Sequence, residues 1–158
     1  MNNNNLEIER RFILRGNSSV DPDEVYEIFQ KYADNGWRYR RQQSGDVIKY
    51  FKTRKTVVGS GVNEEEEYEI TQDEFVNNCG VALKGISKTR SVYHHEGLRF
   101  EVDSFHDLQL VIMEVELDDI AQGVSFPQQL RELIIYEITG IKEFSNGSLA
   151  SAKYLRHF

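Results

Sequence analysis

The chain has 158 residues, of which 39% are hydrophobic and 28% are charged, and its formal net charge is −7 at pH 7. This length suits one domain with a sizeable core, so we expect residues 1–158 to form a single domain. The negative charge argues against general nucleic-acid binding, and the lack of a long apolar run argues against a membrane span.

The start of the chain and its cysteine content favour a cytoplasmic protein. Residues 1–5 are Met1 and a run of asparagines, without the basic and apolar segments of a signal peptide, and we expect them to be a disordered lead-in. The single cysteine, Cys79, excludes an internal disulfide and does not suggest a metal framework.

The first regular stretch, residues 6–14, alternates apolar and charged side chains and is predicted to be a β-strand. Alternate residues of a strand point to the same face. Glu7, Glu9 and Arg11 are therefore expected to project side by side, so two carboxylates and a guanidinium share one face.

The next stretch fits two structures. Asp21-Pro22 followed by apolar residues at helical spacing matches a capped helix. Asn35-Gly36, however, is a strong hairpin signal and needs a strand on its upstream side. We predict a strand over about 25–33, followed by a second strand over 37–42.

The middle of the chain is predicted to be mostly strand. Further strands are expected over 47–55, 64–70, 85–95, 98–105 and 108–117. The Gly-Ser-Gly segment 59–61 is expected to be a flexible loop. Thr71 and Glu74 form a capping box that opens a short helix, which Gly80 is expected to close.

The end of the chain is predicted to be helical. Pro127 is expected to start a helix that Gly140 ends, with an apolar stripe of Leu130, Leu133, Ile134, Tyr136 and Ile138. Residues 148–155 indicate a second short helix.

These elements predict an α+β protein that is mainly β, with eight strands whose short connections favour an antiparallel meander. Each strand has an apolar face and an ionic face. The ionic faces carry about nine carboxylates, Glu7, Glu9, Glu65, Glu67, Glu69, Glu101, Asp103, Glu114 and Glu116. They also carry about eight cations, Arg11, Arg38, Arg40, Lys49, Lys55, Lys88, Arg90 and Arg99.

Two arrangements of this sheet satisfy the pattern. An open sheet would show its charges to water and pack helices on its apolar face. A closed barrel would instead surround a hydrated ionic interior, with the helices packed outside. A dry interior is excluded, because an unpaired buried ion costs several kcal/mol. The strand pattern leaves both arrangements open.

Short motifs on these strands resemble, in order, those of the CYTH superfamily, the triphosphate tunnel metalloenzymes. Glu7-Ile8-Glu9-Arg10-Arg11 looks like the N-terminal Glu-x-Glu-x-Lys, with arginine in place of the lysine. The later motifs are Arg38-Tyr39-Arg40, Thr53-Arg54-Lys55, Glu67-Tyr68-Glu69, Lys88-Thr89-Arg90, Glu101-Val102-Asp103, Glu114-Val115-Glu116 and Asn146-Gly147-Ser148-Leu149-Ala150. They cover nearly the whole chain and look like the short bacterial inorganic triphosphatases. The resemblance implies a closed eight-stranded antiparallel tunnel with a charged lumen.

The same resemblance implies roles for the ionic side chains. The triphosphate would be bound by Arg11, Arg38, Arg40, Lys55, Lys88, Arg90 and Lys142. The metal, Mg²⁺ or Mn²⁺, would be held by Glu7, Glu9, Glu67, Glu69, Glu101, Asp103, Glu114 and Glu116. Catalysis is expected to depend on Glu7, Glu9, Lys88 and Glu116, with a metal-activated water attacking a terminal phosphorus.

The activity implied is metal-dependent hydrolysis of a triphosphate phosphoanhydride, with inorganic triphosphate as the expected substrate. An adenylyl cyclase and a nucleoside or thiamine triphosphatase of the same fold are alternatives. A non-catalytic polyphosphate or nucleotide-binding module is a third, because Arg11 replaces the compact ammonium of lysine with a planar guanidinium. We expect a small-molecule triphosphate as partner, no membrane partner, and a monomer or homodimer.

Overall fold

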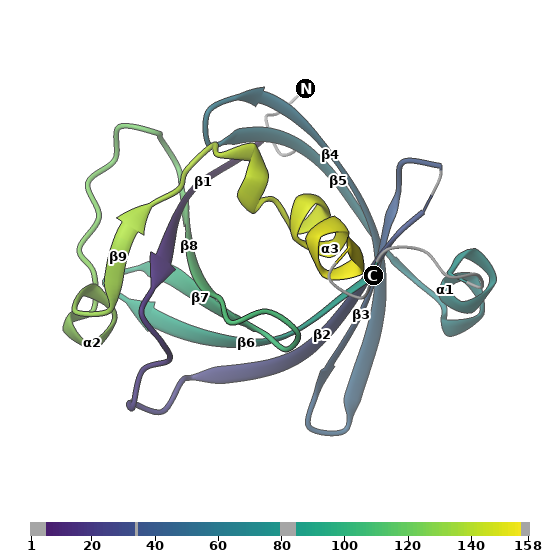
Figure 1. Ribbon diagram of the computed structural model, residues 1–158, viewed down its shortest axis with the longest axis horizontal. Helices are drawn as coiled ribbons and strands as arrows, with labels where there is room; N and C mark the ends of the chain where they lie inside the picture. The colour runs from purple at the N-terminus through teal and green to yellow at the C-terminus, as the bar shows by residue number, and fades with distance from the viewer. Residues whose placement is uncertain (1–5, 34, 80–84, 156–158) are drawn as a thin grey trace.

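The computed structural model describes residues 6–33, 35–79 and 85–155, with side chains up to residue 150, and forms a closed β-barrel (Figure 1). The strands are β1 Leu6–Leu14, β2 Glu24–Tyr32, β3 Arg38–Ser44, β4 Val47–Gly59, β5 Val62–Ile70, β6 Gly85–His95, β7 Leu98–Phe105, β8 Val111–Leu117 and β9 Ile134–Glu137. The helices are α1 Gln72–Asn78, α2 Gln128–Arg131, η1 Lys142–Phe144 (a 3₁₀-helix) and α3 Asn146–Leu155. No helix within these ranges is long and apolar enough to span a membrane.

The sheet is antiparallel and closes on itself. Its order is β5-β4-β3-β2-β6-β7-β8-β1-β9, and β5 also pairs with β1 to complete the ring. The eight predicted strands and the closed antiparallel barrel are thus confirmed, with shifted ends: β4 runs on to Gly59, β5 starts at Val62 and β8 starts at Val111. The expected lead-in 1–5 and the helix end at Gly80 lie outside the described residues.

The helix predicted from Pro127 to Gly140 is wrong, because α2 is a single turn and β9 follows it. On the edge of β1 away from β8, β5 pairs only with residues 6–8. The end of the same edge, residues 12–14, pairs with β9. Without β9 these backbone groups would lack partners, and this requirement outweighs the helical spacing of the apolar residues.

The segment 59–61 is a tight hairpin turn and not the flexible loop predicted. Gly61 is buried with φ 73°, and a Cβ atom there would lie 2.7 Å from the carbonyl oxygen of Glu9. The backbone N–H of Glu9 donates to the carbonyl of Gly61 at 2.9 Å. The β4–β5 hairpin is therefore docked against β1 at the point where the barrel closes.

Two apolar clusters lie on opposite faces of the sheet. The outer cluster includes Phe12, Phe100, Met113, Val115 and Leu130 and is covered by α2. The inner cluster comprises Ile13, Ile86, Phe105, Ile112, Ile138, Leu149 and Ala150. The first four of these share their strand parity with the ionic residues, so the inner cluster fills one end of the lumen.

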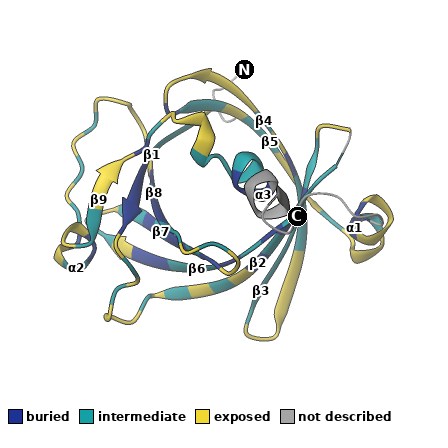
Figure 2. Cartoon of the chain, in the orientation of Figure 1, coloured by how far each residue is buried: buried dark blue, intermediate teal, exposed yellow. Residues whose placement is uncertain are grey.

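Helix α3 departs from the expectation that the helices pack outside. It lies within the ring of strands (Figure 1), and its Leu149 and Ala150 belong to the inner cluster. Helices α1 and α2 do lie outside the ring, and α1 is capped by Thr71 as predicted. Buried residues are most frequent on β1, β6, β7 and β8, whereas β4 and β5 are mostly intermediate or exposed (Figure 2).

Candidate active site

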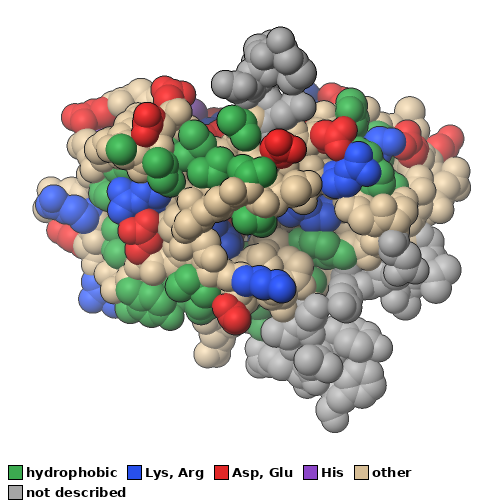
Figure 3. Space-filling view, turned by 90° about the horizontal axis from the view of Figure 1, so that it is seen from above, with side chains coloured by type: hydrophobic (Ala, Val, Ile, Leu, Met, Phe, Trp, Pro, Cys, Tyr) green, Lys and Arg blue, Asp and Glu red, His purple; other side chains and the backbone are tan. Residues whose placement is uncertain are grey.

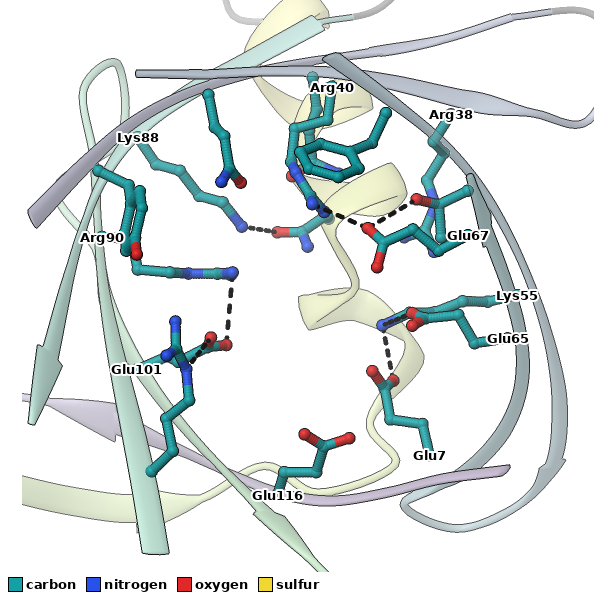
Figure 4. A pocket seen from close by; sticks show the side chains of 17 residues that line it. Glu7, Arg38, Arg40, Lys55, Glu65, Glu67, Lys88, Arg90, Glu101 and Glu116 are labelled. Atoms are coloured by element: carbon teal, nitrogen blue, oxygen red, sulfur yellow. Dashed lines mark hydrogen bonds and ion pairs between the residues drawn. The ribbon is translucent and has the colours of Figure 1, made fainter. Parts of the chain in front are cut away.

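A cavity of about 460 Å³, here the first cavity, occupies the ionic part of the lumen (Figure 4). Its volume lies in the range of small-molecule sites. Six basic side chains line it: Arg38, Arg40, Lys55, Lys88, Arg90 and Arg99. Five carboxylates lie among them: Glu7, Glu65, Glu67, Glu101 and Glu116. The ionic face of the sheet is therefore turned inward.

The charge balance of the first cavity differs from that of the whole protein. The chain carries −7, whereas six basic and five acidic side chains line the cavity. The outer face in Figure 3 mixes acidic, basic and hydrophobic side chains. Because a low-dielectric cleft focuses the field of its lining charges, the lumen is able to attract an anion that the chain as a whole repels.

On the side formed by β3, β4 and β5, the cations are held by carboxylates. Nζ of Lys55 lies 2.7 Å from Oε1 of Glu7 and 3.5 Å from Oε2 of Glu65. Nη2 of Arg40 lies 2.8 Å from Oε1 of Glu67. Figure 4 shows these side chains projecting from the strands into the same space. The ion pairs keep both cations pointing at the cavity, where phosphate oxygens are stronger, multiply charged partners.

Burial and neighbouring charges shift the pKa values here. Burial raises the pKa of Glu65 to about 6, helped by the charge of Glu7. Burial and then Glu7 also raise the pKa of Glu116. Burial alone would lower the pKa of Lys55, but the charges of Glu9 and Glu7 outweigh it and raise that pKa. Acidic groups are thus crowded at this end, and a cation placed among them would relieve their repulsion.

On the opposite side, β6 and β7 hold a buried triad. Nζ of Lys88 lies 2.7 Å from Oδ2 of Asp103. The Arg90 guanidinium donates to both oxygens of Asp103, at 2.8 and 2.9 Å. Burial favours a raised pKa for Asp103, but Arg90 and Lys88 outweigh it, so its pKa is strongly lowered. Burial lowers the pKa of Lys88. Asp103 therefore stays ionised and orients both cations toward the lumen.

Two buried donors in the first cavity, Nη2 of Arg38 and Nε of Arg40, have no hydrogen-bond partner among the residues that the structure describes. The buried Oε1 of Glu7, by contrast, pairs with Nζ of Lys55 at 2.7 Å. Buried polar groups are nearly always satisfied in folded proteins. Two unsatisfied donors on the inward-facing side of β3 therefore suit a site that an anionic ligand completes.

At the solvent-exposed edge of the first cavity, Arg99 joins a network of its own. Its Nε donates to Glu101 at 3.0 Å, and its Nη1 lies 3.5 Å from Glu24. Glu24 also accepts from the hydroxyl of Tyr26 and lies 2.8 Å from Nε2 of His94. Tyr26 lines the cavity beside Arg99, so this network fixes one rim of the opening.

A second cavity of about 710 Å³ lies beside η1 and the β4–β5 hairpin and shares Arg38, Lys55 and Asn146 with the first. Its other charged lining residues are Glu9, Arg11, Glu114 and Lys142. Burial, the charge of Glu114 and a hydrogen bond to it raise the pKa of Glu9 to about 9. Burial favours a raised pKa for Glu114, but the charges of Arg11 and Arg90 outweigh it, so that pKa is lowered.

The lumen offers carboxylate oxygens, the ligands that Mg²⁺ and Mn²⁺ prefer. Among residues 6–33, 35–79 and 85–150, no three or more His, Cys, Asp or Glu side chains converge closely enough to hold a metal ion. Glu7 and Glu116, whose charges interact across the lumen, offer a pair of carboxylates. This fits Mg²⁺, which is commonly held by one or two carboxylates together with substrate phosphates.

The structure brings most of the predicted site residues together. The first cavity receives Glu7, Arg38, Arg40, Lys55, Glu67, Lys88, Arg90, Glu101 and Glu116. The second receives Glu9, Arg11, Glu114 and Lys142. Asp103 lines neither cavity, because it is buried against Lys88 and Arg90. Glu69 is exposed and also lines neither.

Sequence reasoning left several lining residues out of the predicted site. Glu65 and Arg99 share the parity of the predicted residues on their strands, so the alternation alone was sufficient to find them. Gln42 shares it on β3, and Gln30 lies on β2, where no site residue was predicted, because uncharged amides gave no signal of a site. Asn146 was noted only as part of the final motif, and its place between both cavities depends on the position of α3.

Comparisons with known proteins agree with this fold. The chain is similar to NE1496, whose crystal structure is described as an inorganic triphosphatase, with 25% identity over 91% of this chain and 93% of that one and a TM-score of 0.55. A second structure of NE1496, described as a hypothetical protein, gives 27% identity over 91% and 97% and a TM-score of 0.56. The PH1819 protein of Pyrococcus horikoshii OT3 shares the fold, with 16% identity over 96% and 100% and a TM-score of 0.63. No protein-family model and no curated protein matches the chain.

Proposed function

The chain has the fold of the CYTH superfamily and resembles it motif by motif, and from this premise we propose that it is a metal-dependent triphosphatase that hydrolyses inorganic triphosphate. The observation that carries the proposal is the first cavity, where six basic side chains face inward in a chain of net charge −7. A small, highly charged phosphate chain is the ligand that such a lining matches.

Binding is assigned to the basic residues of both sides. Arg38 and Arg40 have buried nitrogen atoms free to donate to phosphate oxygens. Lys88 and Arg90 approach from the other side, oriented by Asp103. Arginine donates in a planar fork that suits phosphate. The phosphate chain would thus be held between β3 and β6, with Lys55 near its end.

Catalysis in this site would need positioning and charge stabilisation more than a covalent nucleophile. A divalent cation, held by Glu7 and Glu116 and the phosphates, would supply charge neutralisation and a water of lowered pKa. Glu101 holds Arg90 and Arg99 in place, with distances of 3.3 and 3.0 Å. Hydrolysis of a terminal phosphoanhydride is the reaction that these groups support.

The proposal is tested by phosphate release from triphosphate, pyrophosphate, ATP and thiamine triphosphate, each with Mg²⁺, with Mn²⁺ and with a chelator. We expect triphosphate to be the best substrate and the chelator to abolish release. Cyclic AMP as the main product from ATP would assign a cyclase instead. Tight triphosphate binding without turnover under either metal would assign a binding module.

A matched pair of variants on β4 localises the activity. Lys55 faces the first cavity, whereas Arg54 faces outward and pairs with Glu66 at 2.7 Å. Lys55→Gln should lower kcat/KM for triphosphate by about 100- to 1000-fold, the effect of removing one preorganised charge contact. Arg54→Gln should leave it unchanged. Equal effects of the two changes would place the reaction outside the lumen.

The metal assignment has its own test. Glu116→Gln should raise the Mn²⁺ concentration needed for half-maximal activity, because an amide is a weaker ligand than a carboxylate for a hard cation. Glu9→Gln distinguishes the predicted ligands further. If this variant has wild-type metal dependence, Glu9 is not a metal ligand and the metal site belongs to the first cavity alone.

A further inference from the structure

Arg11 has a role that its place in the N-terminal motif does not suggest. Its side chain is buried, with 8% of the residue exposed, and it does not line the first cavity. Nη1 donates to the carbonyl oxygen of Phe144 at 2.7 Å, and Nε donates to Oε2 of Glu114 at 3.2 Å. The guanidinium thus connects the barrel strand β8 to the last residue of η1.

The backbone of Arg11 is joined to the same C-terminal region. Its N–H donates to Oγ1 of Thr139 at 2.9 Å, and its carbonyl accepts from the N–H of Ile138 at 2.8 Å. Backbone and side chain together give Arg11 contacts on both sides of the turn between β9 and η1. Arg11 therefore holds in place the segment 138–144, which leads into the lumen, and acts as a clamp on it.

The clamped segment forms part of the boundary between the two cavities. Phe144 packs against the inner cluster, and two residues later Asn146 lines both cavities. Nζ of Lys88 donates to Oδ1 of Asn146 at 3.5 Å. The position of Asn146 therefore depends on Phe144, which Arg11 holds, and affects Lys88, which is proposed to bind substrate.

The guanidinium of Arg11 makes both contacts at once. Arginine presents donors in a rigid planar fork, so it reaches a carboxylate through Nε and a carbonyl through Nη1. Lysine has a single compact ammonium on a flexible chain. Arg11 stands where the family motif has lysine, and its planar fork suits this double contact.

We propose that Arg11 is a positioning residue, which holds Asn146 at the boundary of the two cavities and so limits the length of phosphate chain that the first cavity accepts. This inference rests on the proposed triphosphatase function for its kinetic test. In this proposal, Arg11 binds the protein's own C-terminal segment and does not make the expected contact with triphosphate. Arg38 and Lys55 already line both cavities. Without the clamp, the two cavities would join at these residues.

The kinetic test compares inorganic triphosphate with inorganic tetraphosphate in Arg11→Lys, Asn146→Ala and the double variant. We expect kcat/KM for tetraphosphate relative to triphosphate to rise about tenfold in each single variant, as loss of one charge-assisted hydrogen bond would give. The double variant should show no further rise, because Arg11 is proposed to act through the position of Asn146. Arg10→Lys, on the neighbouring outward-facing residue, is the control.

Two results would overturn the proposal and make Arg11 a substrate contact. One is additivity of the two changes, and the other is an unchanged ratio with a raised KM for triphosphate in Arg11→Lys alone. Asn146→Ala leaves Arg11 intact and keeps the test valid if Arg11→Lys fails to fold.

A second measurement does not depend on activity. Amide hydrogen exchange over residues 142–150 should be faster in Arg11→Lys than in Arg10→Lys, because the segment loses its clamp. Equal exchange rates would overturn the clamp. If the wild-type protein releases no phosphate, the proposed function fails while this exchange measurement still decides the role of Arg11.

Discussion

The two ends of the lumen are built from the same strands and differ in almost every other respect. On β1, β7 and β8 the inward-facing residues are ionic along most of each strand and apolar at one position, namely Ile13, Phe105 and Ile112. On β6 the ionic Lys88 and Arg90 lie between the apolar Ile86 and Val92. The apolar end is closed by α3 and packed without exposed side chains. The ionic end is open and contains unpartnered polar atoms.

The two ends of the lumen are therefore expected to contribute to different properties, the apolar end to stability and the ionic end to catalysis. Apolar burial contributes to folding in proportion to area. Buried ion pairs are weak evidence for stability, because desolvation offsets their attraction. We therefore expect substitutions at the ionic end to affect turnover, and substitutions at the apolar end to affect the free energy of unfolding. The following predictions test that division.

The largest effect is expected where the two ends meet, at Asp103. Asp103→Asn removes the one carboxylate that pairs with both Lys88 and Arg90. Leaving buried charges uncompensated should cost about 3–5 kcal/mol in the free energy of unfolding, measured by urea denaturation. Activity should fall as well, because both cations lose their orientation. Wild-type stability in this variant would show that the triad does not contribute to folding.

At the ionic end, Arg40→Gln is expected to lower kcat/KM for triphosphate by about 100- to 1000-fold. Arg40 faces the cavity and has a buried, unpartnered Nε. Arg41→Gln is the matched control, since Arg41 points away from the cavity and bonds to Gln43. Initial rates of phosphate release measure both. A loss of stability larger than the loss of activity in Arg40→Gln would contradict the division.

At the apolar end, Ile112→Val should behave in the opposite way. Ile112 is 1% exposed within the inner cluster. Removing one buried methylene should lower the free energy of unfolding by about 0.5–1.5 kcal/mol. Thermal or urea unfolding measures this, and kcat/KM at 25 °C should be unchanged. A changed substrate preference would mean that this end contacts the ligand.

The smallest effect is expected outside the barrel, at the pair Arg10–Glu137. Hydrogen bonds from Arg10 lower the pKa of Glu137. A lowered carboxyl pKa stabilises the fold above the unfolded-state value of about 4.3, and this contribution is lost as the pH falls through the folded-state pKa. Because both side chains are partly exposed, Arg10→Gln should cost below about 1 kcal/mol at pH 7. The difference between the unfolding curves of wild type and variant should therefore be smaller at pH 3 than at pH 7.

Much of the barrel follows from local sequence. Alternation predicted which residues of β1 share a face, and Asn35-Gly36 correctly favoured a strand over a helix for β2. The strand β9 was not predictable in this way, because its apolar residues also fit a helix. Its structure is decided by the free edge of β1, more than a hundred residues away.

The site was predictable to a similar degree. Parity and the family motifs identified the ionic lining, since each strand carries its charges on one face. Neither signal predicted that Glu7 and Glu9, neighbours on the same face of β1, would line different cavities. That separation depends on where η1 and α3 enter the lumen. The tertiary contact between Arg11 and Phe144 holds this segment in its position.

A crystal structure of the protein with Mn²⁺ and a non-hydrolysable imido analogue of triphosphate would locate the proposed site. We expect a phosphate chain in the first cavity between Arg40 and Lys88, with an anomalous manganese peak beside Glu116. A ligand bound on the outer surface, with the lumen filled only by water, would contradict this expectation.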